Sequence, residues 1–309
     1  MRDRESWQRF DHIGGVQSSV SQAESHAAPV REGEWVQKAM IGRCKLCGET
    51  KILLDSHYIP KGVYRRLRDA TFENPNPWKV TKKTATQTSK QLTAYLLCQD
   101  CEQLLNKNGE KWVLANCLQE NANFPLASIL DARTADQGVY GDPTKIFFAA
   151  NIPKINIQAL AYFAVSIFWR GSIYGWNSDS SIPIKLGPFA EQFRRYLLGF
   201  EKFPQHCALW VIVREGQEFE RVTYTPVNEI NRKVHVCKFP MPGLAFMLLV
   251  SKNIPAQYRS MCLVNGEGNP IYYSSAIEHL IKEEMLKMFQ HIPPERRRLI
   301  RIEPDAQRR

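Results

Sequence analysis

CKLCG at residues 44–48 and LLCQDC at residues 96–101 contain two pairs of cysteines, and two residues separate the members of each pair. This spacer lets both thiolates of a pair reach one metal ion, and a structural zinc ion takes four such ligands in a tetrahedron. Gly48 follows the first pair, where the chain has to turn sharply beneath a metal. We therefore predict that one zinc ion is bound by Cys44, Cys47, Cys98 and Cys101.

The order of features around the cysteines predicts a treble clef, which is a knuckle, a β-hairpin and then a helix that carries the last two ligands. The 50 residues between the pairs exceed the spacing of an ordinary zinc ribbon, so this insertion must loop out. The alternatives are two unrelated pairs or one redox pair. A thioredoxin-like redox pair needs a βαβ context, which the sequence lacks. The fold class we expect is α+β.

Composition favours a globular protein that binds polyanions. The chain has 309 residues, of which 44% are hydrophobic and 23% charged, and this composition excludes wholesale disorder. Its formal net charge of +10 favours a polyanion such as nucleic acid, or an anionic membrane surface, as a partner. No apolar run approaches the 18 residues of a membrane span, and residues 1–12 lack the apolar region of a secretory signal. We therefore expect a cytoplasmic protein without a membrane partner. Four further cysteines have apolar neighbours and read as small core residues: Cys117, Cys207, Cys237 and Cys262.

The chain divides by composition into an arm (residues 1–36), a zinc domain (37–118), a mixed α/β domain (119–292) and a basic tail (293–309). We expect a strand at 52–54, a helix at 157–172 and a second helix opening at Leu186-Gly187-Pro188. Turn signals make residues 120–155 a connector. Further strands are expected at 207–213, 234–239 and 243–250, and a closing amphipathic helix at 276–291.

Between the cysteine pairs, Ser56-His57-Tyr58-Ile59-Pro60 follows the expected strand, and Tyr64 comes shortly after. The second pair is followed by Glu102 and Glu110. In these elements the chain resembles HNH-type treble-clef proteins, and more closely a largely uncharacterised prokaryotic group with CxxCG, SHxIPxxxY and LLCxxC motifs. Ser166–Arg170 and Leu186–Pro188 are similar to landmarks of the same group, so the resemblance covers roughly residues 40–250.

The resemblance implies a divalent-metal-dependent endonuclease in which His57 is the general base and Mg²⁺ or Mn²⁺ acts at the phosphate. The family's usual metal ligand directly precedes that histidine, and here Ser56 occupies the position. Three residues can substitute: Asp55, which shares a strand face with His57, and Glu102 or Asn106 on the helix after Cys101. The plain alternatives are that His57 bonds a loop carbonyl, that Asp55 is a turn acid, and that Glu102 and Glu110 pair with Lys107 and Lys111.

Residues 61–90 form a basic insertion with eight Lys or Arg against two acids, more than half of the chain's net charge. Tyr64, Phe72 and Trp78 lie among these cations, a mixture that suits phosphate contacts with base stacking. The candidate nucleic-acid contacts are Lys61, Arg65, Arg66, Arg68, Lys82 and Lys83. We expect Arg170, at the end of the 157–172 helix, to be structural because a cation there meets the negative end of the helix dipole.

Two functional hypotheses follow. The first is an HNH-like endonuclease with structural zinc that acts on nucleic acid, with DNA as the favoured substrate, and the resemblance suggests prokaryotic phage defence as a setting. The second is a non-catalytic zinc-dependent nucleic-acid-binding or adaptor protein, favoured by Ser56 at the ligand position. An interaction module whose charge is incidental is a weaker third. The second half shows no catalytic motif, so a homodimer contact or a protein partner is a role open to it.

Overall fold

The computed structural model describes residues 40–68, 74–80, 85–120, 123–176, 182–214, 225–231 and 234–274. Several predictions lie outside these ranges: the arm, the helix at 276–291, the basic tail, and the two cations Lys82 and Lys83. No helix within the described ranges is long and apolar enough to cross a membrane.

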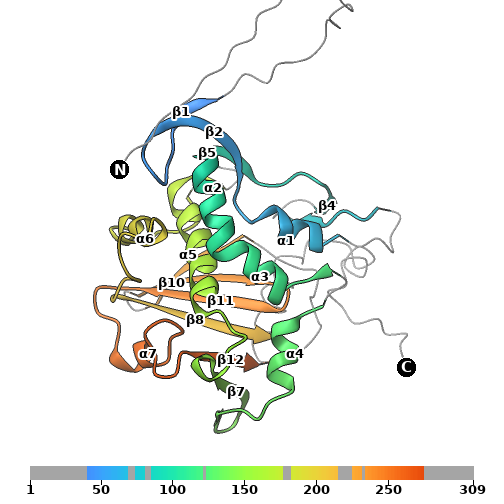
Figure 1. The fold of residues 1–309 in the computed structure, drawn as a ribbon, viewed down its shortest axis with the longest axis vertical. Coiled ribbons are helices and arrows are strands. Elements are labelled where there is room, and N and C mark those ends of the chain that lie inside the picture. Colours follow the sequence, from blue (N-terminus) through green and yellow to red (C-terminus); the bar gives the residue numbers. More distant parts are fainter. Residues whose placement is uncertain are drawn as a thin grey trace, which may run out of the picture. The chain divides into compact units, whose positions relative to one another are not determined.

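The N-terminal part of the described chain forms a small antiparallel sheet (Figure 1), and the first cysteine pair lies in the turn between its first two strands. It consists of β1 (Ile41–Arg43), β2 (Thr50–His57) and β5 (Thr93–Cys98), in the order β1-β2-β5. Ile41 lies opposite Ile52, and Leu53 lies opposite Cys98. The strand expected at 52–54 is confirmed as part of β2. The pairing of β2 with β5 places both cysteine pairs at the same end of the sheet.

The second cysteine pair opens a helix, as predicted, and that helix contains an irregular turn. α2 (Gln99–Leu105) continues into a π-helical turn, η1 (Asn106–Glu110), and then into α3 (Lys111–Asn116). A Cβ on Gly109 would lie 2.8 Å from the backbone nitrogen of Phe163, so glycine is needed where η1 meets α5 (Ile157–Ile173). The wide turn therefore sits where two helices approach closely, and single π-helical turns of this kind within α-helices are frequent at functional sites.

The basic insertion contains regular structure. α1 (Lys61–Arg66) starts directly after Pro60, and β3 (Trp78–Val80) pairs with β4 (Ala85–Gln87) as an antiparallel hairpin. A loop or an exposed hairpin was expected around residues 81–89, and the hairpin is the form the described residues take.

The second half of the described chain builds a mixed sheet of seven strands in the order β6-β7-β12-β8-β11-β10-β9. Its pairs are antiparallel except for the parallel pair of β12 with β8. The expected strands at 207–213, 234–239 and 243–250 are confirmed. The strands are β6 (Gln137–Val139), β7 (Asp142–Phe148), β8 (Cys207–Arg214), β9 (Val227–Asn231), β10 (Val234–Met241), β11 (Leu244–Val250) and β12 (Pro270–Ser274).

The prediction of a connector at 120–155 was wrong. That stretch contains α4 (Pro125–Asp131), the strands β6 and β7, and the short 3-10 helix η3 (Ala149–Asn151). β7 is a strand because β12 pairs along it, with Ile271 opposite Phe147. The apolar side chains of β7 are confined to its last three residues, Ile146, Phe147 and Phe148, so the local sequence pattern resembled a loop.

α5 confirms the helix expected at 157–172, and it ties the two halves together. Asn156 caps its start by accepting a hydrogen bond from Ala159 N at 2.9 Å. The helix lies across one face of the large sheet (Figure 1), with the rings of Phe163 and Phe246 5.7 Å apart. α6 (Phe189–Leu197), also predicted, packs beside it, and α7 (Ala256–Ser260) follows β11. One hydrophobic cluster runs from the cysteine pairs to β11, so both halves share a core.

Candidate functional site

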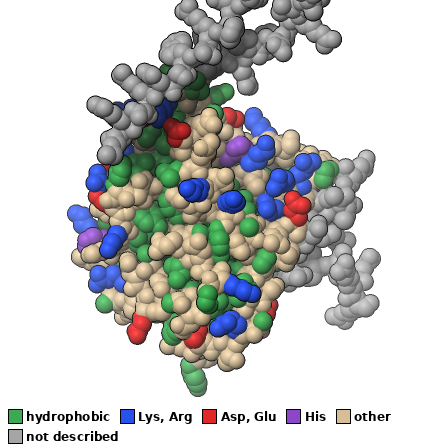
Figure 2. Space-filling model, in the orientation of Figure 1, with side chains coloured by type: hydrophobic (Ala, Val, Ile, Leu, Met, Phe, Trp, Pro, Cys, Tyr) green, Lys and Arg blue, Asp and Glu red, His purple; other side chains and the backbone are tan. Residues whose placement is uncertain are grey.

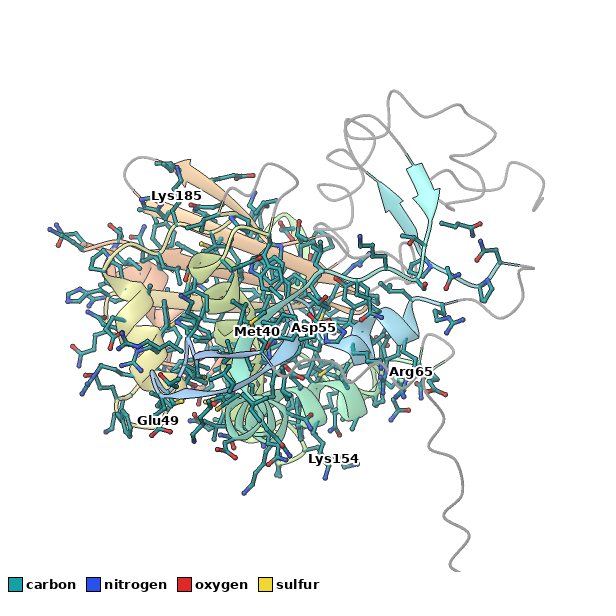
Figure 3. The ribbon with its side chains drawn as sticks, turned by 90° about the horizontal axis from the view of Figure 1, so that it is seen from above. Met40, Glu49, Asp55, Arg65, Lys154 and Lys185 are labelled. Carbon is teal, nitrogen blue, oxygen red and sulfur yellow. The ribbon has the colours of Figure 1, made fainter. Side chains whose placement is uncertain are left out.

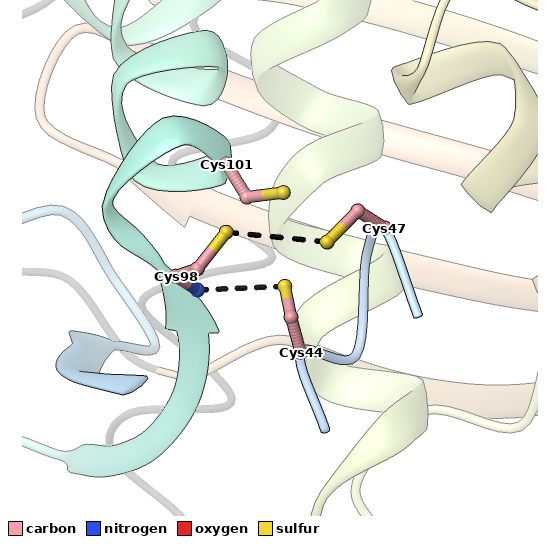
Figure 4. A group of neighbouring side chains, drawn as sticks. All are labelled: Cys44, Cys47, Cys98 and Cys101. Atoms are coloured by element: carbon pink, nitrogen blue, oxygen red, sulfur yellow. Dashed lines mark hydrogen bonds between the residues drawn. The ribbon is translucent and has the colours of Figure 1, made fainter. Parts of the chain in front are cut away.

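The four predicted cysteines converge, and they can hold a metal ion (Figure 4). Their sulfur atoms all lie within 4.8 Å of one another, and Cys47 Sγ is 4.0 Å from Cys98 Sγ. A tetrahedron with metal–sulfur bonds of about 2.3 Å has sulfur–sulfur edges of about 3.8 Å, close to this spacing. Cys44, Cys98 and Cys101 are buried and Cys47 is partly buried, so a bound ion would be screened from solvent.

Hydrogen bonds around the cysteine cluster favour the deprotonated, thiolate form of Cys44. Cys98 N donates to Cys44 Sγ at 3.4 Å, and Gly48 N donates to Cys44 O at 2.9 Å within a turn that holds Gly48 at a φ of 84°. A hydrogen bond from Cys101 lowers the pKa of the Cys44 thiol. The cluster thus favours a thiolate at Cys44, which is the form that binds metals.

A residue from the second half of the chain, Arg194, hydrogen-bonds the backbone between the two cysteines of the first pair. Arg194 on α6 donates to the carbonyl oxygen of Leu46, between Cys44 and Cys47, at 2.5 Å. Its other guanidinium nitrogens bind both oxygens of Glu191. Outer hydrogen bonds of this kind hold metal ligands in orientation. The sequence offered no signal for this contact, because 148 positions separate the two residues.

His57 ends β2 and lines a hollow of about 280 Å³ beside the cysteine cluster. The same hollow is lined by Glu102, Gln103 and Asn106 from the helix, by Pro60 and Lys61, and by Glu110 and Arg170. Burial lowers the pKa of His57, although the nearby carboxylates of Asp55 and Glu102 oppose that shift. The imidazole is therefore neutral at pH 7 and able to accept a proton.

Glu102 presents an unsatisfied carboxylate oxygen at this hollow. Its Oε2 accepts a long hydrogen bond of 3.5 Å from Arg170, whereas its Oε1 is buried and has no hydrogen-bond partner within the described residues. Buried carboxylate oxygens are normally paired, so this oxygen has its lone pairs open to water, a cation or another ligand that enters the hollow. Asn106 adds an amide oxygen of the kind that Mg²⁺ and Mn²⁺ accept.

Arg170 has partners that the sequence did not predict. It is 1% exposed, and both of its terminal nitrogens donate to Glu110 Oε1 at 3.0 Å, so its partners are side chains of the hollow. The expectation that it is structural because it meets the dipole of its own helix is therefore incomplete. Glu102 and Glu110 both face Arg170, which argues against the alternative in which they pair with Lys107 and Lys111.

The two residues before His57 are placed differently from each other. Ser56 is 2% exposed; its Oγ accepts from Leu97 N at 3.1 Å and donates to Leu54 O at 3.3 Å. These bonds bridge the register shift between β2 and β5, so the hydroxyl is committed to the backbone. Asp55 shares the outer face with His57, as predicted, but it is exposed and does not line the hollow.

The predicted cationic contacts divide by burial. Lys61, Arg65 and Arg68 are exposed on or just after α1, and Lys and Arg side chains gather over that part of the surface (Figure 2). Arg65 points outward (Figure 3) and meets Glu120 at 3.8 Å. Arg66 is half-buried and donates to the carbonyls of Gly62 and Leu114, so its guanidinium fastens α1 to α3.

No protein-family model, curated protein or solved structure matches this chain.

Proposed function

We propose that this protein is a divalent-metal-dependent endonuclease, with DNA as the favoured substrate, built on a zinc-stabilised treble clef of the HNH type. The observation that carries the proposal is the buried, unpartnered Glu102 Oε1, which shares one hollow with a neutral His57 and with Asn106. A base for water and oxygen ligands for a cation are thereby brought together, which hydrolysis of a phosphodiester requires.

The treble-clef assignment rests on the order of elements. The knuckle of Cys44 and Cys47 joins β1 to β2, and β5 leads into the helix that carries Cys98 and Cys101. Four thiols at tetrahedral spacing, without oxygen or imidazole ligands among the clustered groups, favour zinc over harder cations. Because a closed four-cysteine site leaves no open position, this zinc would be structural.

In the proposed mechanism, the imidazole of His57 accepts the proton of the attacking water. The free oxygen of Glu102 and the amide oxygen of Asn106 would hold Mg²⁺ or Mn²⁺, which supplies charge stabilisation at the scissile phosphate and the leaving oxygen. Lys61, at the rim of the hollow, and Arg65 and Arg68 would bind flanking phosphates and set the register of the strand. A role in prokaryotic phage defence is part of the proposal through resemblance alone.

The test is plasmid cleavage by zinc-loaded protein with Mg²⁺ or Mn²⁺, comparing wild type with His57→Ala and Glu102→Gln. We expect both variants to lose at least about 100-fold in rate, the size of one general-base contribution. Glu201→Gln, which changes a surface carboxylate paired with Arg195, is the matched control and should cut normally. Full activity in His57→Ala would refute the mechanism.

The second candidate is a non-catalytic nucleic-acid-binding scaffold, and Ser56 is the observation that favours it. The hydroxyl at the family's ligand position is buried and bonded to backbone, so it offers a cation nothing. This alternative expects salt-sensitive DNA or RNA binding that Arg65→Ala and Arg68→Ala weaken together, and no turnover with any divalent ion. Arg66→Ala would instead reduce stability, because its two terminal nitrogens donate to the carbonyl oxygens of Gly62 and Leu114.

A further inference from the structure

The buried guanidinium of Arg170 divides its contacts unequally between two carboxylates. Two hydrogen bonds of 3.0 Å go to Glu110 Oε1, whereas the contact with Glu102 Oε2 is 3.5 Å. The side chain of Arg170 is 2% exposed, and those of Glu110 and Glu102 are 13% and 24% exposed. Because water screens these three largely buried side chains poorly, the electrostatic attraction of Arg170 is strong, and it is stronger toward the closer carboxylate, Glu110, than toward Glu102.

We propose that Glu110 is a positioning residue that occupies Arg170 and thereby leaves Glu102 available to a divalent cation. The inference rests on the proposed function, since it concerns the same cation. Without Glu110, Arg170 would form its ion pair with Glu102 alone. A carboxylate in a close arginine ion pair is a poor metal ligand, because its oxygens are already engaged. With Glu110 present, Glu102 is oriented through Oε2 and keeps Oε1 unbonded.

The surrounding structure holds the backbone of Arg170 in place. Its carbonyl oxygen accepts from Trp176 Nε1 at 2.8 Å, and its helix packs closely against η1 at Gly109. Its side chain is 2% exposed, so the guanidinium has little solvent to turn into. The π-helical turn ends at Glu110, so it sets where that carboxylate meets Arg170. The second half of the chain therefore contributes to the site, a role that its sequence did not disclose.

The experiment measures Mn²⁺ binding by zinc-loaded protein, following the free Mn²⁺ signal by electron paramagnetic resonance without any substrate. Wild type should bind Mn²⁺, and Glu102→Gln should abolish that binding. Glu110→Gln should weaken binding about 10-fold, although Glu110 is not itself a ligand. The double variant Arg170→Gln/Glu110→Gln should restore binding to within about 3-fold of wild type, because no charge is left to capture Glu102. Glu201→Gln is the control for loss of a surface carboxylate.

The outcomes separate this inference from the function on which it rests. Glu110→Gln binding as wild type would overturn the positioning role alone, and the Glu102 site would stand. Weak binding that the double variant fails to restore would make Glu110 a ligand, which also overturns it. Wild type without Mn²⁺ binding would remove the proposed function together with the inference. Circular dichroism and zinc content confirm that each variant is folded, and restoration in the double variant excludes simple loss of structure.

Discussion

At the residue scale, Ser56 shows how a position can be structural inside a functional motif. Its hydroxyl accepts from Leu97 N and donates to Leu54 O where β2 and β5 change register. Truncation leaves the buried Leu97 N–H without a partner, so Ser56→Ala should lower the free energy of unfolding by about 1–3 kcal/mol. Urea denaturation measures this. Ser128→Ala, at an exposed hydroxyl, should stay within about 0.5 kcal/mol, and equal losses in both would contradict our account.

His57 gives a prediction about pH. Burial lowers its pKa in the folded protein, so protonation favours the unfolded state, where the value is about 6.5. The stability that the neutral imidazole contributes is present above that unfolded value and is lost as pH falls toward the lower folded pKa. His57→Gln should therefore lose less stability than wild type between pH 8 and pH 5, as measured by denaturant unfolding. Equal losses of stability in the two proteins would show that the pKa of His57 is not lowered in the folded state.

The same histidine sets the expected rate profile. If the neutral imidazole is the base, the cleavage rate should rise as the pH passes through the lowered pKa of folded His57. The rate should reach its plateau at a pH below the ordinary histidine pKa of about 6.5. Single-turnover rates at saturating Mn²⁺ across pH 5 to 8 measure this. A rate still climbing steeply above pH 7 would assign the proton transfer to another group, such as a metal-bound water.

Local spacing in the sequence predicted which side chains the structure brings together. The convergence of Cys44, Cys47, Cys98 and Cys101 was predictable because two-residue spacers are specific. Glu102 and Asn106 line one hollow because they lie four positions apart on one helix, and their catalytic role stays a prediction. The role of Arg170 was predicted only from the dipole of its own helix, because no pattern near it in the sequence indicates a contact with Glu110. A contact across 60 positions depends on how α5 packs, and that information lies in the core.

At the element scale, the turn between α2 and α3 depends on one glycine. A Cβ at Gly109 would lie 2.8 Å from Phe163 N and 2.9 Å from Phe163 Cα, and backbone atoms cannot yield as a side-chain tip can. Gly109→Ala should therefore cost about 1–3 kcal/mol in free energy of unfolding, the range of an overpacked core. It should also weaken Mn²⁺ binding, because η1 carries Asn106 and ends at Glu110.

A second glycine provides the control for this prediction. A Cβ at Gly138 meets nothing within 4 Å, and its backbone is not left-handed. Gly138→Ala should leave stability within about 0.5 kcal/mol of wild type in the same denaturant titration. If Gly109→Ala behaved as mildly as Gly138→Ala, the close approach of η1 to α5 would not constrain the site.

Elements were predictable where their own residues decided them. α5 is apolar along its length, and β8 and β11 are runs of apolar residues buried on both faces, so each was found. β6 and β7 were missed because turn residues dominate that stretch and β12 supplies the pairing from more than 100 positions away. The coarse α and β content was therefore accessible, while the strand order was not.

At the scale of the whole molecule, the cysteine cluster and the large sheet share one hydrophobic core. Within the described residues, one cluster of buried side chains joins Cys44 and Cys98 to Leu248. Arg194 binding Leu46 O and Arg170 binding Glu110 add polar links between the halves. Loss of the metal should therefore be felt far from the cysteines, since metal binding and folding are coupled.

Hydrogen exchange before and after zinc removal by a strong chelator tests this. Repulsion among uncovered thiolates should open β2 and β5. β11, in the second half, should lose protection at the same chelator concentration because it shares their core. Cys98→Ser should reproduce both losses, whereas Cys262→Ser, in a separate small cluster, should leave zinc content and β2 protection unchanged. If β11 stayed fully protected while β2 exchanged freely, the halves would be independent domains, and a site assembled from both would open without unfolding the sheet.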